Sequence, residues 1–222
     1  IVDGLGSEQQ THSIFKAKKN GKIDLLFEQK GVGIGALYTL VTHRLGFGVG
    51  EEGKTMGLAP YGENFSHQDK KLPSLRGILN KGIADYSMQI TRHPSAKLKI
   101  SLKKPINKKE VYKPYFSRLA FNLQKESERC LLHIAKHALK ISKSKNLCFA
   151  GGVALNCVAN NKIQKINEVD NFFVQPASGD SGIPIGLAMA GLEEIGFNLG
   201  KLFNSTNRVK LKNRYSSDAQ PL

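Results

Sequence analysis

The sequence predicts an α/β fold with a mixed sheet and flanking helices. Two β–α units follow one another: an apolar run at 146–150 precedes a helical pattern at 153–166, and a run at 171–177 precedes another at 181–196. Successive units of this kind place parallel strands in one sheet. Residues 1–30 add short β-rich runs, and the turn "KNGK" between two of them is typical of an antiparallel hairpin.

The region after this hairpin predicts a helix followed by a loop. Leu37, Leu40 and Val41 recur at helical spacing within residues 35–47. Residues 48–63 are too rich in glycine for a regular element, so we expect a loop there. Loops of this length commonly carry functional residues.

Residues 72–109 have mixed patterns and are interpreted as an insertion. We expect a short helix at 72–82, followed by strands at 84–93 and 97–102.

The longest helix is expected at 109–143. Apolar and small side chains recur there at steps of three and four residues and define one buried stripe: Phe116, Leu119, Leu123, Ser127, Cys130, Ile134, Ala138 and Ile141. His133 and His137 lie four residues apart, a spacing that can bind zinc. Because Glu126 and Arg129 share their face, we interpret the pair as part of a solvated surface.

The chain is strongly basic. Lys and Arg number 33 against 18 Asp and Glu, which gives a formal net charge of +15. A charge of this size would suit a polyanionic partner. The lysines are dispersed, however, and few aromatic residues lie among them, which favours a solvated surface over a nucleic-acid groove. Nucleic-acid binding is an alternative supported by charge alone.

Cysteine usage and hydropathy indicate a cytoplasmic protein without a membrane partner. Cys130, Cys148 and Cys157 are an odd number without a CxxC pair, which indicates reduced, mostly buried thiols. No apolar run is long enough to cross a bilayer, and the opening "IVDGLGSEQQ" lacks the features of a signal peptide.

Three short glycine-containing segments follow expected strands: "VDGLG" at 2–6, "AGGVALN" at 150–156 and "ASGDSG" at 177–182. Ligands of α/β sheets gather beyond the carboxyl ends of the strands, so these turns could share one cleft.

Gly151 and Gly152 would leave room for a nucleotide in this cleft. Glycine permits positive φ and a close ligand approach, while the following helix offers unpaired N–H groups to an anion. Asn156, one turn further on, could reach a sugar or a base edge. The alternative is a tight turn with close packing and no ligand.

Asp3 and Asp180 could together coordinate one divalent cation, because carboxylates at two strand ends can meet at the same edge of a sheet. Each aspartate also has a structural alternative. Asp180 could cap the following helix, and Asp3 could stabilise a turn.

Three motifs in this order resemble the signature stretches of the NodU/CmcH-type carbamoyltransferases: "KTMGLAPYG" at 54–62, "FAGGVALNCVAN" at 149–160 and "VQPASGDSGIPIGLAM" at 174–189. The opening "IVDGLGSEQQTHSIF" resembles the start of that family's second half. The resemblance covers roughly residues 1–195.

The resemblance implies a ribonuclease-H-like topology within the actin-like ATPase superfamily. Family members transfer a carbamoyl group from carbamoyl phosphate, through carbamoyl-adenylate formed with ATP, to a hydroxyl of a small-molecule acceptor. They use a divalent metal, which is iron by the family pattern.

By the same resemblance, Asp3 and Asp180 match metal ligands, and Ser181 would face the acceptor. Gly151, Gly152 and Asn156 match the nucleotide-contacting segment.

The family pattern also implies that part of the protein is missing from this chain. Residues 1–197 match the second half of the transfer domain, one subdomain of a two-lobed domain, with the insertion at about 72–109. Residues 198–222 are interpreted as a loose tail that links to a C-terminal domain. A metal-binding histidine pair would precede residue 1. We therefore expect the isolated chain to be inactive, and to pair with missing halves of a split enzyme or with itself. The alternative is a non-catalytic nucleotide-binding or scaffold module.

Overall fold

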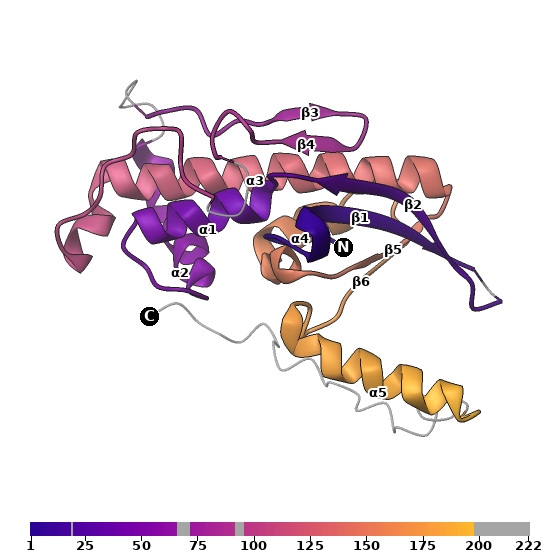
Figure 1. The fold of residues 1–222 in the computed structure, drawn as a ribbon. Coiled ribbons are helices and arrows are strands. Elements are labelled where there is room, and N and C mark those ends of the chain that lie inside the picture. The colour runs from indigo at the N-terminus through magenta and orange to yellow at the C-terminus, as the bar shows by residue number, and fades with distance from the viewer. Residues whose placement is uncertain (19, 66–71, 92–95, 198–222) are drawn as a thin grey trace, which may run out of the picture. The chain divides into compact units, whose positions relative to one another are not determined.

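The computed structural model describes residues 1–18, 20–65, 72–91 and 96–197. The tail expected at 198–222 lies outside these ranges. The chain divides into two units, at 1–180 and from 181 onward. The first unit contains all the described strands and most of the helices (Figure 1).

The strands of the first unit form the two kinds of pair that the sequence predicts. Strands β1 (Gln10–Ala17) and β2 (Ile23–Lys30) form the antiparallel hairpin. Strands β5 (Asn146–Phe149) and β6 (Asn171–Val174) run parallel, with Cys148 opposite Phe173. The mixture of antiparallel and parallel pairing within an α/β unit is thus confirmed.

Residues 1–3 join these two pairs through backbone hydrogen bonds. Asp3 N donates to Thr11 O of β1 at 3.0 Å, and Val2 N donates to Ala150 O, directly after β5, at 2.9 Å. The hydrogen-bonded segments therefore lie side by side in the order β2, β1, residues 1–3, β5, β6. Residues 1–3 lie at the centre of this order.

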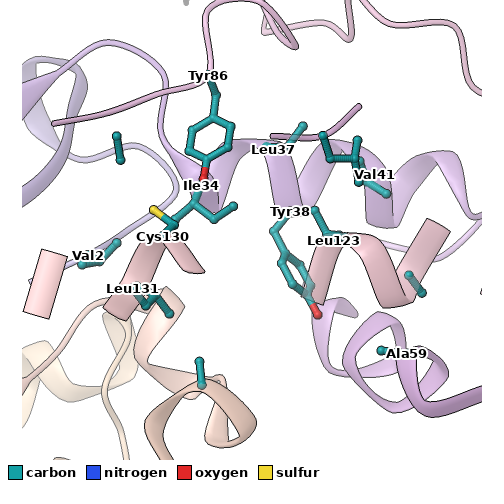
Figure 2. Packing of buried hydrophobic residues seen from close by; sticks show 14 of the residues in the cluster. Val2, Ile34, Leu37, Tyr38, Val41, Ala59, Tyr86, Leu123, Cys130 and Leu131 are labelled. Carbon is teal, nitrogen blue, oxygen red and sulfur yellow. The ribbon is translucent and has the colours of Figure 1, made fainter. Parts of the chain in front are cut away.

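Helix α3 (Pro114–Ser142) organises the core of the first unit. Its predicted stripe is buried except at Ile141, which is partly exposed. The helix contacts α1 (Ile34–Arg44) and α4 (Cys157–Gln164) as well as β4 (Ile83–Asp85), so it is covered on several sides (Figure 1). Figure 2 shows Leu123, Cys130 and Leu131 of α3 within the cluster of buried side chains.

The prediction of a loop at 48–63 is wrong. Helix α2 (Glu52–Leu58) and a 3₁₀ helix (Ala59–Phe65) occupy this stretch. A Cβ on Gly62 would lie 2.1 Å from the carbonyl oxygen of Ser117 on α3. At Gly62, therefore, glycine permits close helix packing and does not mark a loop.

The insertion also differs from the prediction. The short helix expected at 72–82 is absent, and β3 (Ile78–Asn80) pairs with β4 in an antiparallel hairpin. Lys81 and Gly82 form its turn with φ of 46° and 90°. Within the described residues, the long strands expected at 84–93 and 97–102 reduce to β4 and one isolated bridge, while residues 92–93 lie outside the described ranges. A 3₁₀ helix (Lys108–Tyr112) precedes α3.

Three histidines surround the turn of this hairpin. His12 Nε2 lies 3.0 Å from Gly82 O, and Gly82 N donates to His133 Nε2 at 3.1 Å. A Cβ on Gly82 would lie 2.3 Å from His137 Cδ2. The hairpin thus covers the face with His133 and His137 in part: both side chains are half-buried, so the interpretation as a solvated surface holds only in part.

Acid is expected to destabilise the fold through this histidine cluster of His12, His133 and His137. Burial lowers the pKa of His12 from 6.5 to about 4, and desolvation also lowers the pKa of the other two. Between pH 6.5 and about 4 the unfolded chain therefore binds a proton at His12 that the folded chain does not. The unfolding free energy should fall across this window by about 3 kcal/mol from His12 alone.

Urea unfolding at pH 7, 6, 5 and 4 would measure this loss. His12→Gln keeps a side-chain N–H for Gly82 O. In this variant the unfolding free energy should fall less on acidification, by the amount that His12 contributes in the wild type. Equal pH dependence in the two proteins would contradict the assignment.

The cysteines match their prediction only in part. All three are free thiols, and Cys130 is buried, which raises its pKa to about 12. Cys148 and Cys157 are exposed, so the expectation of mostly buried thiols is wrong for them.

The second unit contains α5 (Ile183–Glu194), which begins with Ile183 and Pro184 after a 3₁₀ turn at Asp180–Gly182. It has no buried residue, although most of its side chains are apolar. Within the described ranges, no helix combines the length and the apolar character that crossing a membrane requires.

Candidate functional site

The three glycine-containing turns of the first unit meet at one place. Gly151 N donates to Ser178 O at 2.8 Å, which joins the turn after β5 to the turn after β6. Gly152 N donates to Asp3 Oδ2 at 3.0 Å, which joins it to the turn after residues 1–3. The three turns therefore adjoin at Asp3, Gly151–Gly152 and Ser178, while a shared cleft stays a prediction.

Glycine is required at 151 because another backbone lies against it. Gly151 has φ of 99° and ψ of 164°, a conformation almost restricted to glycine. A Cβ there would lie 2.1 Å from Val2 O. At Gly152 a Cβ would lie 3.0 Å from Asp3 Oδ1. The neighbouring strand end thus explains both glycines without a ligand.

The backbone N–H groups of this turn already have acceptors in the protein. Beyond the bonds of Gly151 and Gly152, Val153 N donates to Val2 O at 3.3 Å and Ala154 N to Gly151 O at 2.9 Å. The turn does not present these four groups unpaired to an anion, as the sequence suggested. Nucleotide binding by Gly151 and Gly152 stays a prediction.

Asp3 is half-buried and its carboxylate is held at two points. Oδ1 accepts from Gly4 N at 2.7 Å, and Oδ2 accepts from Gly152 N. The start of α1 approaches the same turn, because a Cβ on Gly35 would lie 2.6 Å from Asp3 O. Asp3 therefore has the turn-stabilising role that was left open, and its metal role stays a prediction.

Asp180 is exposed and follows Gly179, whose added Cβ would lie 3.6 Å from Gly152 Cα. The Asp180 turn thus adjoins the Gly152 turn within the first unit. Ser181 begins the second unit, so its predicted role toward an acceptor stays a prediction.

The residues present fit a divalent metal only in part. Asp3 and Asp180 offer carboxylate oxygens, and the buried Ser178 Oγ, two residues before Asp180, has no hydrogen-bond partner in the described structure. Within the described ranges, however, no group of three or more His, Cys, Asp or Glu side chains could hold a metal ion. This chain's described residues would need further ligands to complete such a site.

Asn156 is buried and bonded within the protein. Its Oδ1 accepts from Ala159 N at 3.0 Å, so it caps α4, and it pairs with the amide of Gln124 on α3. Sequence reasoning missed Gln124, since a glutamine within a long amphipathic helix gives no signal of a partner 32 residues away. The predicted contact of Asn156 with a nucleotide is not tested by these bonds.

The sequence as a whole matches a known protein family. Residues 1–189 match the family described as "Carbamoyltransferase N-terminus". The chain belongs to this carbamoyltransferase family, as the three signature motifs indicated.

Curated relatives agree with this assignment. The chain is 33% identical over 163 residues to nodulation protein NolNO of Sinorhizobium fredii, covering 73% of this chain and 23% of the relative. It is 32% identical over 164 residues to nodulation protein NolO of Bradyrhizobium diazoefficiens, covering 73% and 29%. An uncharacterized protein of Synechocystis, sll1178, is 33% identical over 203 residues, covering 85% and 32%. The chain thus spans less than a third of each of these relatives.

Proposed function

We propose that this chain is part of an enzyme that transfers a carbamoyl group from carbamoyl phosphate, through carbamoyl-adenylate, to a hydroxyl of a small-molecule acceptor. The family assignment supports carbamoyl transfer as the activity. The main structural support for the site is that the three turns adjoin. Gly152 N binds the Asp3 carboxylate, and the turn before Asp180 lies next to Gly152. Carbamoyl phosphate and ATP would be the other substrates.

The lateral order of the strands supports an actin-like ATPase fold with ribonuclease-H-like topology as the fuller description. In the order β2, β1, residues 1–3, β5, β6, the first strand in sequence lies centrally, with an antiparallel hairpin on one side and a parallel pair on the other. The carboxyl ends of residues 1–3, β5 and β6 then share one edge, where α/β sheets bind ligands.

The roles proposed for the residues follow from their positions. Asp3 and Asp180 would provide carboxylate oxygens to a divalent metal, and iron is our candidate. Such a metal, when bound, supplies positive charge that stabilises a developing oxyanion. Gly151 and Gly152 would form the surface under the nucleotide, while Ser181 would lie toward the acceptor.

A non-catalytic nucleotide-binding module is the second candidate. It is favoured by the incomplete ligand set, because two aspartates alone hold a divalent ion weakly. Turnover separates the two candidates when the chain is combined with the remainder of such an enzyme. We expect no turnover from the 222-residue chain alone with ATP, carbamoyl phosphate and a hydroxyl acceptor.

Asp180→Asn tests the metal role most directly, because Asp180 is exposed and its loss should leave the fold intact. We expect Mn²⁺ binding, followed by electron paramagnetic resonance, to weaken at least about tenfold, because the loss of a residue that only supports a metal ligand already costs that much. Asp170→Asn, an exposed aspartate directly before β6, is the matched control and should bind Mn²⁺ like the wild type. Asp3→Asn should also weaken binding, with some loss of stability because its two N–H donors need both oxygens. Unchanged Mn²⁺ affinity in both the Asp3 and the Asp180 variants would refute the metal site.

A further inference from the structure

A buried set of polar side chains joins three helices directly behind the candidate site. We call it the Gln124 network; its members are Tyr38 of α1, Gln124 and Glu128 of α3, Asn156 at the start of α4, and Lys162 of α4. Gln124 and Glu128 are each only 4% exposed, and Asn156 is 9% exposed. Polar groups at this depth are costly unless they are bonded to one another.

The centre of the network is a reciprocal pair of side-chain amides. Gln124 Nε2 donates to Asn156 Oδ1 at 3.0 Å, and Asn156 Nδ2 donates to Gln124 Oε1 at 3.0 Å. The outer partners fix which way each amide faces. The carboxylate of Glu128 can only accept, at 3.3 Å from Gln124 Nε2, and the N–H of Ala159 can only donate, at 3.0 Å from Asn156 Oδ1. The reciprocal amide pair in this orientation satisfies both outer partners, the Glu128 carboxylate and the Ala159 N–H.

Gln124 uses all of its hydrogen-bonding capacity in this arrangement. Tyr38 OH supplies a second donor to Gln124 Oε1 at 3.2 Å, while Lys162 Nζ balances the buried charge of Glu128 at 2.5 Å. Burial raises the pKa of Tyr38, so its hydroxyl stays a donor. Asparagine is too short and leucine lacks the polar atoms, so neither could replace Gln124 here.

The network meets the site through one short turn. A 3₁₀ helix (Gly152–Leu155) leads from the Gly152 N–H that binds Asp3 to Asn156, whose own N–H donates to Val153 O at 3.1 Å. Fixing Asn156 therefore fixes the far end of the turn that contacts Asp3.

We propose that Gln124 is a positioning residue: its amide holds Asn156, and through it holds the Gly151–Gly152 turn against Asp3. Asn156 then acts by placing the turn, while its side chain stays bonded to α3 and to Ala159. The nucleotide part of this inference rests on the proposed function, because only there is the turn a nucleotide site. The positioning itself rests on the bonds alone.

Gln124→Glu tests this role in the 222-residue chain. It keeps the size and the acceptors of the side chain but removes both donors and places a carboxylate beside Glu128. We expect amide hydrogen exchange at Gly152 and Val153 to become about tenfold faster or more, while the amides of α3 that face the β3–β4 hairpin stay protected. The double variant Gln124→Glu/Glu128→Gln restores the bond between residues 124 and 128 but still leaves Asn156 Oδ1 without its donor from residue 124, so exchange at Gly152 and Val153 should stay faster than in the wild type. Gln164→Glu, at an exposed glutamine of α4, is the matched control and should exchange like the wild type.

A second variant covers the case in which Gln124→Glu does not fold. Tyr38→Phe removes only one hydroxyl and keeps the ring, and it should raise exchange at Gly152 and Val153 several-fold. Unchanged exchange at these two amides in the folded variants, or equal acceleration throughout the chain, would overturn the positioning role.

Calorimetric titration with Mg·ATP separates this inference from the proposed function. Gln124→Glu should weaken the Mg·ATP affinity about tenfold, the loss typical when a residue behind a ligand contact is removed. If the wild type binds no Mg·ATP, the nucleotide site on this chain is refuted, and the exchange data still decide the role of Gln124. If both proteins bind equally and exchange equally, the inference fails and the proposed function stands.

Discussion

Gly151→Ala is expected to destabilise the chain by about 3–5 kcal/mol, because it combines backbone strain with a steric clash. The added Cβ would lie 2.1 Å from Val2 O and 2.7 Å from Val2 C, and both belong to backbone that cannot rotate away. The φ of 99° adds strain for any side chain. Either Val2 or the turn must move, and each movement breaks the bond between Gly152 N and Asp3 Oδ2. The midpoint temperature of thermal unfolding should fall by about 10 °C for a chain of this size.

Gly57→Ala is the matched control for this prediction. Gly57 lies in α2 with no atom within 4 Å of an added Cβ. Alanine should be neutral there or should stabilise the helix by up to about 1 kcal/mol. A Gly151→Ala protein as stable as the Gly57→Ala protein would show that residues 1–3 do not lie against the turn after β5.

The elements with strong local periodicity could be predicted from the sequence. The hairpin of β1 and β2, the long helix α3 and the parallel pair of β5 and β6 depend on alternation, on helical spacing and on turn residues that are visible within one short window. Each of these elements formed near its expected bounds.

The errors lie where a distant partner decides the local structure. Gly62 indicated a loop, yet its lack of a side chain serves contact with Ser117, which is far away in sequence. The segment of β3 and its turn predicts a helix, because nothing local reveals that His12 and His133 bind the turn at Gly82. Packing overrode propensity in both cases.

The candidate site also has features that the sequence predicts and features that depend on distant partners. That the turns at Asp3, Gly151 and Gly179 meet follows from the rule for the carboxyl ends of strands, so sequence alone was sufficient. Which N–H groups remain for a ligand could not be predicted, because Gly152 N is used by the Asp3 carboxylate across the sheet. The same limit applies to Gln124, whose partner Asn156 lies on another helix.

Glu126 is the buried charge that fastens the insertion to α3. It is 4% exposed, and its Oε1 accepts from Gly77 N at 2.9 Å, Tyr86 OH at 2.8 Å and Arg129 Nη2 at 2.7 Å. Its Oε2 accepts from Arg129 Nε at 2.8 Å, and Arg129 Nη2 also donates to Gly77 O at 2.7 Å. Figure 2 shows the Tyr86 ring among the buried side chains close to Cys130. One carboxylate thus accepts hydrogen bonds from three residues, two of them in the insertion.

Glu126→Ala should therefore cost about 3–5 kcal/mol, the range for removing one partner of a buried ion pair. The Tyr86 hydroxyl and the Gly77 N–H each lose their Glu126 acceptor, and Arg129 loses its carboxylate partner and keeps only its bond to Gly77 O. Urea unfolding at pH 7 would measure the loss, and amide exchange at Gly77 and in β4 should accelerate before that of α3 does. Asp170→Ala removes one partner of the exposed pair with Lys145 and should change stability little. Similar small effects in both variants would mean that the insertion is held by its apolar contacts, chiefly through Leu75 and Tyr86, and that the ion pair adds nothing to them.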